Sequence, residues 1–138
     1  MIFASQEDTA AFVAQSCGLD GIPWVQWTAI GVMDAKGMAG GIVFTNYCHG
    51  RDIEVHIAIR PKSRGAIVFS YGFWYVFSQL QCARISATIE ADNTPSRRIC
   101  ERLGFVQEGI KRQAGRQGQD CLIYGILKHE VTHGTDLP

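Results

Sequence analysis

Asn-Thr-Pro-Ser-Arg-Arg-Ile-Cys-Glu-Arg-Leu-Gly-Phe, from Asn93 to Phe105, is the stretch that decides the fold. Within it Thr94 can cap a helix, and Pro95 suits the first helical turn, where a backbone N–H has no intrahelical partner. Gly104 supplies the left-handed residue on which helices commonly end. The stretch therefore predicts a short helix that stops abruptly at Gly104.

Strands are expected on both sides of this helix. Arg84–Ile89 alternates in polarity and is rich in β-branched residues, and Phe105 opens another apolar segment. Further upstream, Asp52–Arg60 alternates most clearly, with isoleucine and valine on one face and polar or small side chains on the other.

Between these strands lies the apolar segment Ala66–Gln81. Many of its residues favour strands, but its length without a turn signal suits a buried helix better. A strand, a helix and a second strand form a right-handed crossover, so the strands at Ile53 and Ile85 are expected to be parallel neighbours. Ligands bind at the carboxyl ends of such strands.

The rest of the chain predicts shorter elements around this unit. A chain of 138 residues is long enough for one core and too short for two ordinary domains, so we expect a single domain over residues 1–138, with 129–138 as a flexible tail. We expect a helix at Glu7–Ser16, a strand at Val25–Met33, a turn at Asp34–Gly37 and the partner strand at Met38–Tyr47. A final hairpin is expected from Glu108–Gln113 and Asp120–Lys128.

Composition narrows the class of protein. Thirteen basic and thirteen acidic residues give a formal net charge of zero, which argues against a nucleic-acid partner. The five cysteines are odd in number and form no CxxC pair, so reduced thiols in a cytoplasm are the simplest account. The longest apolar stretch, Ala66–Leu80, is shorter than a membrane crossing needs. We expect a soluble cytoplasmic protein without a membrane partner.

The stretch Asn93–Phe105, with its continuation Val106–Arg112, resembles the GNAT superfamily of acyl-CoA-dependent N-acetyltransferases. It is most similar to the branch of ribosomal-protein N-terminal acetyltransferases and small phage-borne relatives, in which an Asn, a Ser, Leu-Gly-Phe and Glu-Gly recur at this spacing. The resemblance covers Asp52–Glu130. It implies an α/β fold whose mixed, mostly antiparallel sheet holds one parallel strand pair and is flanked by helices.

The resemblance also implies acetyl-CoA as co-substrate and a primary amine as acceptor. In this family a backbone amide of the strand corresponding to Asp52–Arg60 binds the acetyl carbonyl, which places that amide near Ile57, Ala58 or Ile59. A glycine-bearing loop at the entrance of the next helix binds the diphosphate.

That loop corresponds here to Arg64, Gly65 and Ala66. The family pattern has further glycines after this point, and this chain has Ile67 and Phe69 at those positions. The loop therefore departs from the family pattern there. An ordinary turn between a strand and a helix is the alternative interpretation of the loop.

Acetyl transfer to an ammonium requires a base, and Glu54 is the first candidate, with His56 two residues on and on the same face. A surface carboxylate and a hydrogen-bonded structural histidine are the alternatives. For the proton donor, many family members have a Tyr where this chain has Cys100. Ser96 could contact the cofactor thiol instead, as a Ser does in the branch that the chain resembles, and Asn93 resembles the Asn that contacts the pantetheine arm.

Each of these last residues has a simpler alternative. Cys100 could pack in the core, Ser96 could serve local backbone donors, and Asn93 could form a helix-entry turn. His129 and His133 are spaced like a helical metal pair, but no further ligand is near them in the sequence, so we expect no metal. The aromatic residues Trp24, Trp27 and Tyr47 are loose candidates for the acceptor side.

Two functions remain open. One is an N-acetyltransferase, and the other is a catalytically weak or inactive GNAT-like module that binds acyl-CoA or a protein. A homodimer is possible, with the aromatic residues around Trp74 and Tyr75 as its candidate surface. The sequence does not select the acceptor.

Overall fold

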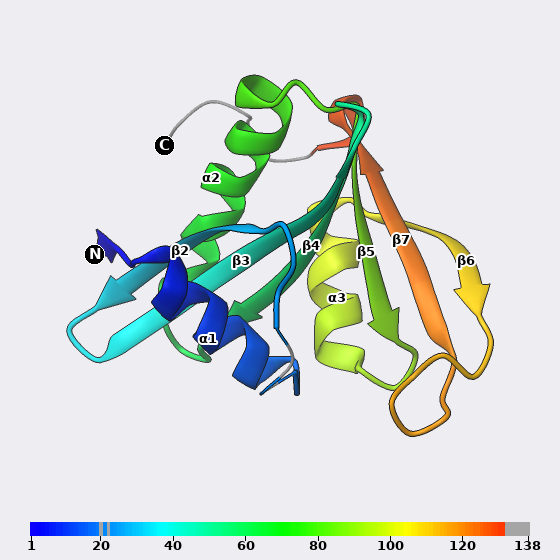
Figure 1. Ribbon diagram of the computed structural model, residues 1–138, viewed down its shortest axis with the longest axis horizontal. Coiled ribbons are helices and arrows are strands. Elements are labelled where there is room, and N and C mark those ends of the chain that lie inside the picture. The colour runs from blue at the N-terminus through cyan, green and yellow to red at the C-terminus, as the bar shows by residue number, and fades with distance from the viewer. Residues whose placement is uncertain (20, 22, 132–138) are drawn as a thin grey trace.

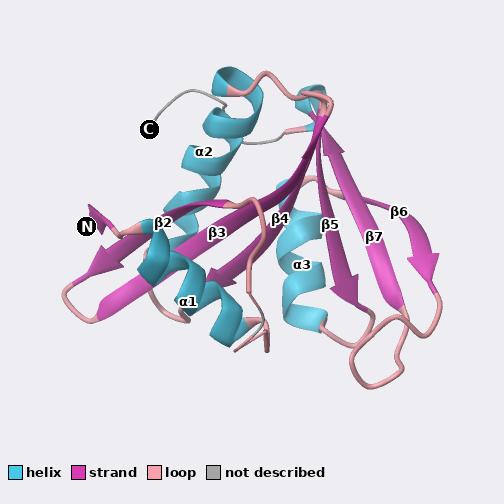
Figure 2. Ribbon diagram, viewed as in Figure 1, coloured by secondary structure: helices cyan, strands magenta, loops and turns pink. Residues whose placement is uncertain are grey.

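The computed structural model describes residues 1–19, 21 and 23–131. One seven-stranded sheet runs through the molecule in the order β1-β2-β3-β4-β5-β7-β6 (Figures 1 and 2). The strands and helices are β1 (Ile2–Phe3), α1 (Gln6–Ser16), β2 (Thr28–Asp34), β3 (Gly37–Cys48), β4 (Asp52–Ile59), α2 (Val68–Phe73), β5 (Arg84–Glu90), α3 (Thr94–Leu103), β6 (Val106–Lys111) and β7 (Cys121–Leu127).

All neighbouring strands are antiparallel except β4 and β5, which are parallel. Their register pair is Glu54 with Ser86. The predicted parallel neighbours at Ile53 and Ile85 are therefore confirmed, as is the predicted fold class. The final hairpin folds so that β7 lies between β5 and β6.

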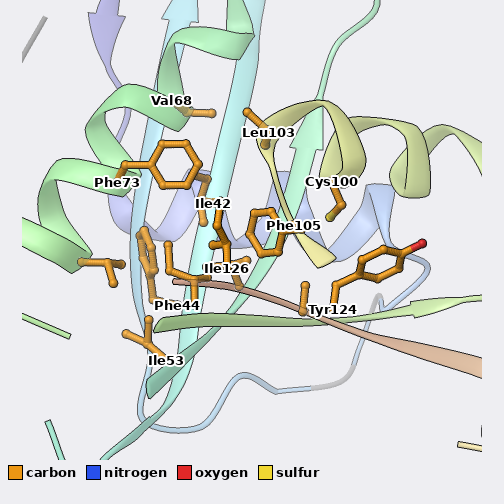
Figure 3. Close-up of a cluster of buried hydrophobic side chains, with 14 of the residues drawn as sticks. Ile42, Phe44, Ile53, Val68, Phe73, Cys100, Leu103, Phe105, Tyr124 and Ile126 are labelled. Carbon is orange, nitrogen blue, oxygen red and sulfur yellow. The ribbon is translucent and has the colours of Figure 1, made fainter. Parts of the chain in front are cut away.

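Helices cover both faces of the sheet. On one face, which we call the α1 face, Ala10 and Val13 of α1 pack on Val43 and Ala58 of β3 and β4. On the opposite α2/α3 face lies the main core, in which side chains of α2 and α3 pack on the sheet (Figure 3). Its largest fully buried side chains include Tyr124, Phe44 and Phe77.

The contested segment after β4 is helical, as its length predicts, but it changes type along its course. A 3₁₀ turn at Gly65–Ile67 leads into α2, and a π-helical stretch at Trp74–Gln79 follows. Gly72 is poor in a helix, yet a Cβ atom there would lie 2.7 Å from Cδ1 of Ile42. Close packing on β3 therefore accounts for this glycine.

Several predicted boundaries were wrong. The strand expected from Val25 begins at Thr28. The N-cap of α3 is Asn93, whose side chain accepts a hydrogen bond from the N–H of Ser96 at 3.4 Å, so Thr94 is the first helical residue instead of the cap. The short edge strand β1 was not predicted.

The end of the chain is described only in part. Lys128–Glu130 forms a 3₁₀ turn at the start of the expected tail. The remaining tail residues from 132 on, with His133 of the histidine pair, lie outside the described residues. All five cysteines are free thiols, and Cys48 is the exposed one. Among the described helices, none is long and apolar enough to cross a membrane.

Candidate active site

A gap opens between β4 and β5. Glu54 and Ser86 form the register pair at one end, whereas β4 continues to Ile59 and β5 to Glu90 without a further parallel pair among the described residues. In Figure 1 the two strands meet at the top of the view and diverge downward. The gap therefore lies at the carboxyl ends of the two parallel strands, where the crossover topology predicts a ligand.

Backbone groups of β4 face this gap. The N–H of Arg60 donates to the carbonyl oxygen of Ala39 in β3 at 2.8 Å, so the backbone of Arg60 points toward β3. Because successive strand residues point their backbone groups to opposite sides, Ala58 also faces β3, whereas Ile57 and Ile59 face β5. The thiol of Cys17, 3.8 Å from the carbonyl oxygen of Ile57, agrees with this direction. Of the three predicted amide donors, Ile57 and Ile59 thus face the gap and Ala58 does not.

An apolar cleft adjoins the gap on the α2/α3 face. Its free volume is about 10 Å³, about the room that a single water molecule needs. Ile57 of β4 and Ile85 of β5 line it from the two sides of the gap. The other lining residues come from β3, β4, α2 and the end of α3, namely Ile42, Phe44, Val55, Phe69, Gly72, Phe73, Leu103 and Phe105. No charged group lines the cleft, and a ligand chain could enter it only if its walls moved apart.

Glu54 and His56 lie on the other side of β4, on the α1 face. Glu54 Oε2 accepts a hydrogen bond from Asn46 Nδ2 at 2.8 Å. Nε2 of His56 is 3.1 Å from the hydroxyl of Thr45, and its ring lies 4.9 Å from the ring of Trp24. Burial lowers the pKa of His56, and the nearby Glu54 carboxylate only partly opposes this effect. The imidazole is therefore neutral at neutral pH.

The predicted phosphate loop is exposed in part. Arg64 and Ala66 are exposed, but Gly65 is buried, and its N–H donates to Ser63 Oγ at 3.1 Å. A Cβ atom at Gly65 would collide with the carbonyl oxygen of Ala39. Close packing on β3 thus requires this glycine whether or not a phosphate binds. Ile67 points into a separate groove beside β1 with Phe3 and Tyr71, among others.

The three candidates of α3 divide between its start and its buried side. Asn93 caps the helix, which confirms its local alternative, and the residue is exposed. Ser96 is partly buried one turn on. Cys100 is 4% exposed in the main core (Figure 3), where burial raises the pKa of its thiol to about 12. A thiol held this way is a poor proton donor, and core packing accounts for it.

Two residues at the gap were missed by the sequence analysis. Cys17 contacts Ile57 from 40 positions away, and Arg116 donates to the carbonyl oxygen of Gly18 from 98 positions away. No local pattern marks either residue, because each acts through a partner that only the folded sheet brings near. Of the loose aromatic candidates, Trp24 and Trp27 pack beside α1, whereas Tyr47 is 54% exposed.

The profile of the Acetyltransferase (GNAT) domain matches residues 3–106. A curated relative is the uncharacterized N-acetyltransferase YnaD from Bacillus subtilis. It is 25% identical to this chain in an alignment that covers 91% of this chain and 76% of the relative.

Solved structures share the fold. A mutant form of the spermidine N-acetyltransferase SpeG from Vibrio cholerae has a TM-score of 0.74 at 17% identity, covering 99% of this chain and 100% of that one. A GNAT-family acetyltransferase from Bacillus anthracis has a TM-score of 0.67 at 22% identity, covering 91% and 92%. At these identities the likeness concerns the fold.

Proposed function

The chain belongs to the GNAT acetyltransferase family, and from this premise we propose that it transfers acetyl from acetyl-CoA to a primary amine by direct attack, without a covalent enzyme intermediate. Acetyl-CoA would supply the activated acetyl group. The residues of this chain would bind its arm, orient the acetyl carbonyl and remove a proton from the amine. The amine nitrogen would bond to the acetyl carbon as the carbon–sulfur bond breaks, and CoA would leave as a thiolate that takes up a proton from water. The acceptor is a small molecule or a protein amine, and the Asn93, Ser96 and Leu103–Phe105 pattern supports a relation to the ribosomal-protein branch.

This proposal rests on one observation. The N–H of Ile57 faces a gap that has apolar side chains on one face of the sheet and polar side chains on the other. The apolar cleft lies on the α2/α3 face, and Glu54 and His56 lie on the α1 face. In the proposal the pantetheine arm enters the gap along the cleft, whose walls move apart to admit it, and the amine approaches from the α1 face. Ile57 N–H then donates to the acetyl oxygen, on which negative charge develops during attack.

Glu54 is the proposed base. Its carboxylate has a neutral amide, Asn46, as its hydrogen-bond partner, and no ion pair among the described residues engages it. It can therefore attract the ammonium form of an acceptor and take up its proton, directly or through water. His56 is the second candidate, and its neutral imidazole can accept a proton through the nitrogen that Thr45 does not contact.

The burial of Cys100 favours a second candidate function. Because the family commonly has a Tyr donor at this position, a buried cysteine supports a module that binds acyl-CoA with weak or no transfer. Asn93 and Ser96 would serve binding equally in both functions.

Two measurements on the same preparation separate these functions. Binding of acetyl-CoA is measured by calorimetry, and release of free CoA is measured with a panel of polyamines, amino acids, aminoglycosides and peptides with free N-termini. Binding together with turnover on an amine is expected. Tight binding without turnover on any amine would favour the binding module, and absence of binding heat would contradict both functions.

A further inference from the structure

The two halves of the sheet are joined on the α1 face at both ends of the gap. At the closed end, Ser86 of β5 donates to Asp52 of β4 at 2.7 Å beside the Glu54–Ser86 register pair. At the open end, Arg116 from the β6–β7 loop donates through Nε to Glu90 Oε1 at 2.8 Å and through Nη1 to the carbonyl oxygen of Gly18 at 2.9 Å. The first contact is close to the strand pairing, whereas the second bridges separate elements.

The partners of Arg116 belong to different halves. Glu90 ends β5, and Gly18 follows Cys17, the C-cap of α1, which packs on β3 and β4. Arg116 therefore ties the half of the sheet that ends with β4 to the half that begins with β5. The planar guanidinium suits this role because its fork presents donors in two fixed directions.

Close contacts surround both anchoring points. Gly18 has φ +71°, and a Cβ atom there would collide with Nη1 of Arg116. On the other side, Gln119 Nε2 donates to the second oxygen of Glu90 at 2.8 Å and holds that carboxylate in place. The N–H of Ala91 donates to the carbonyl oxygen of Asp120 at 2.8 Å, so the loop that carries Arg116 is itself fixed to the end of β5.

The contacts of Arg116 with Glu90 and Gly18, which we call the strap, lie next to the gap-facing backbone of β4. Cys17, the residue before Gly18, is partly buried with its thiol 3.8 Å from the carbonyl oxygen of Ile57. Any movement of Gly18 away from Glu90 thus moves the side chain that covers Ile57.

We propose that Arg116 is a positioning residue that straps the open end of the gap and holds Cys17 against Ile57, so that the amine acceptor meets the acetyl group in a fixed geometry. The part of this statement that concerns the acceptor rests on the proposed transferase function. The strap itself is a property of the fold and can be tested without turnover.

The test follows modification of Cys17 by N-ethylmaleimide, read by mass spectrometry of its peptide, in the wild-type chain and in Arg116→Ala. Loss of the strap exposes the thiol, and labelling is expected to become about three- to tenfold faster, the range that corresponds to loss of one or two partly exposed hydrogen bonds. Burial raises the pKa of Cys17 and the charge of Arg116 opposes that effect. Removing the arginine without moving Gly18 would therefore make the thiol less reactive, and slower or unchanged labelling would overturn the strap.

Three further comparisons make the result specific. The buried thiols of Cys82, Cys100 and Cys121 must keep their wild-type labelling rates, because a parallel rise in all of them would show general unfolding and would also overturn the proposal. Arg116→Lys, which can reach one partner but not both, is expected to fall between wild type and Arg116→Ala. Arg112→Ala removes an exposed arginine of the same loop whose side chain forms no hydrogen bond or ion pair with the described residues, and it should leave Cys17 unchanged.

If the chain turns over an amine, Arg116→Ala should lower kcat about tenfold and leave acetyl-CoA affinity within about twofold of wild type, because orientation is lost and the cleft on the opposite face is not. If labelling becomes faster but kcat is unchanged, the strap holds Cys17 in place but does not orient the acceptor, and its role in transfer is overturned. Absence of turnover in the wild type would contradict the transferase and leave the labelling result standing.

Discussion

Glu54 and Ser86 face each other across β4 and β5 as a parallel register pair, and beyond them the strands separate. The residue of β4 that next points its backbone toward β5 past Val55 is Ile57. Its amide is thus freed by the end of pairing, which gives a polar group at the junction of the apolar cleft and the α1 face.

Glu54→Gln is expected to lower kcat about 100-fold while the affinity for acetyl-CoA stays within about twofold of wild type. Gln keeps the shape and can keep the contact with Asn46 but cannot accept the proton. Steady-state kinetics with calorimetric binding checks this, and Glu7→Gln, an exposed carboxylate in the first turn of α1, is the control. Wild-type turnover of Glu54→Gln from neutral to alkaline pH would remove Glu54 from the mechanism.

Gly65→Ala is expected to lower the free energy of unfolding by about 3 kcal/mol or to prevent folding, because its methyl group would meet the backbone of β3 at Ala39. Gly109→Ala is the matched control, since a Cβ atom there makes only an ordinary contact, 3.6 Å from Cδ1 of Ile123. Urea unfolding measures both variants. Equal stability of the two would show that the helix entrance after β4 is not packed against β3 as described.

Cys100→Ala is expected to lower the free energy of unfolding by about 1 kcal/mol and to leave kcat unchanged. The thiol is buried in the core, and its pKa of about 12 makes it a poor source of protons. Kinetics on folded protein and urea unfolding check the two parts separately. A large loss of kcat at wild-type stability would restore Cys100 as the proton donor.

His56 is expected to make stability fall on mild acidification. Its folded pKa lies below the ordinary value of 6.5, so between these values the unfolded chain binds a proton that the folded chain does not. The contribution is complete above about pH 7 and is lost as the pH falls toward the folded pKa. Glu90, whose pKa its hydrogen bond with Arg116 lowers, acts in the same direction but only below the ordinary carboxylate range.

Urea unfolding at about pH 7.5 and about pH 5.5 measures this effect. In His56→Gln, which can keep a hydrogen bond with Thr45, the difference in unfolding free energy between the two pH values should shrink. An unchanged difference would assign the pH dependence to another group.

Much of the fold could be predicted because its elements carry local signals. Asp52–Arg60 alternates, Gly104 ends α3 at φ +101°, and the order of strand and helix fixes the parallel pair by handedness alone. Boundaries failed where two neighbouring residues compete for one role. Asn93 and Thr94 can both cap a helix, and only the backbone geometry decides between them.

The site was less accessible to prediction from sequence. Residue type and alternation placed Glu54 and His56 together on one face of β4, and the structure has both on the α1 face. Which of Ile57, Ala58 and Ile59 offers its amide depends on the pairing partner of each residue, which the sequence does not encode locally. Gly65 fits a phosphate-loop pattern, yet its burial against Ala39 is a packing requirement that the same pattern conceals.

The most direct measurement is a crystal structure of the chain with acetyl-CoA bound. We expect the pantetheine arm in the cleft lined by Ile57 and Ile85, and the acetyl oxygen about 2.9 Å from the backbone nitrogen of Ile57. An acetyl group bound away from the gap, or β4 and β5 paired beyond Glu54 and Ser86 so that no group enters, would contradict the account.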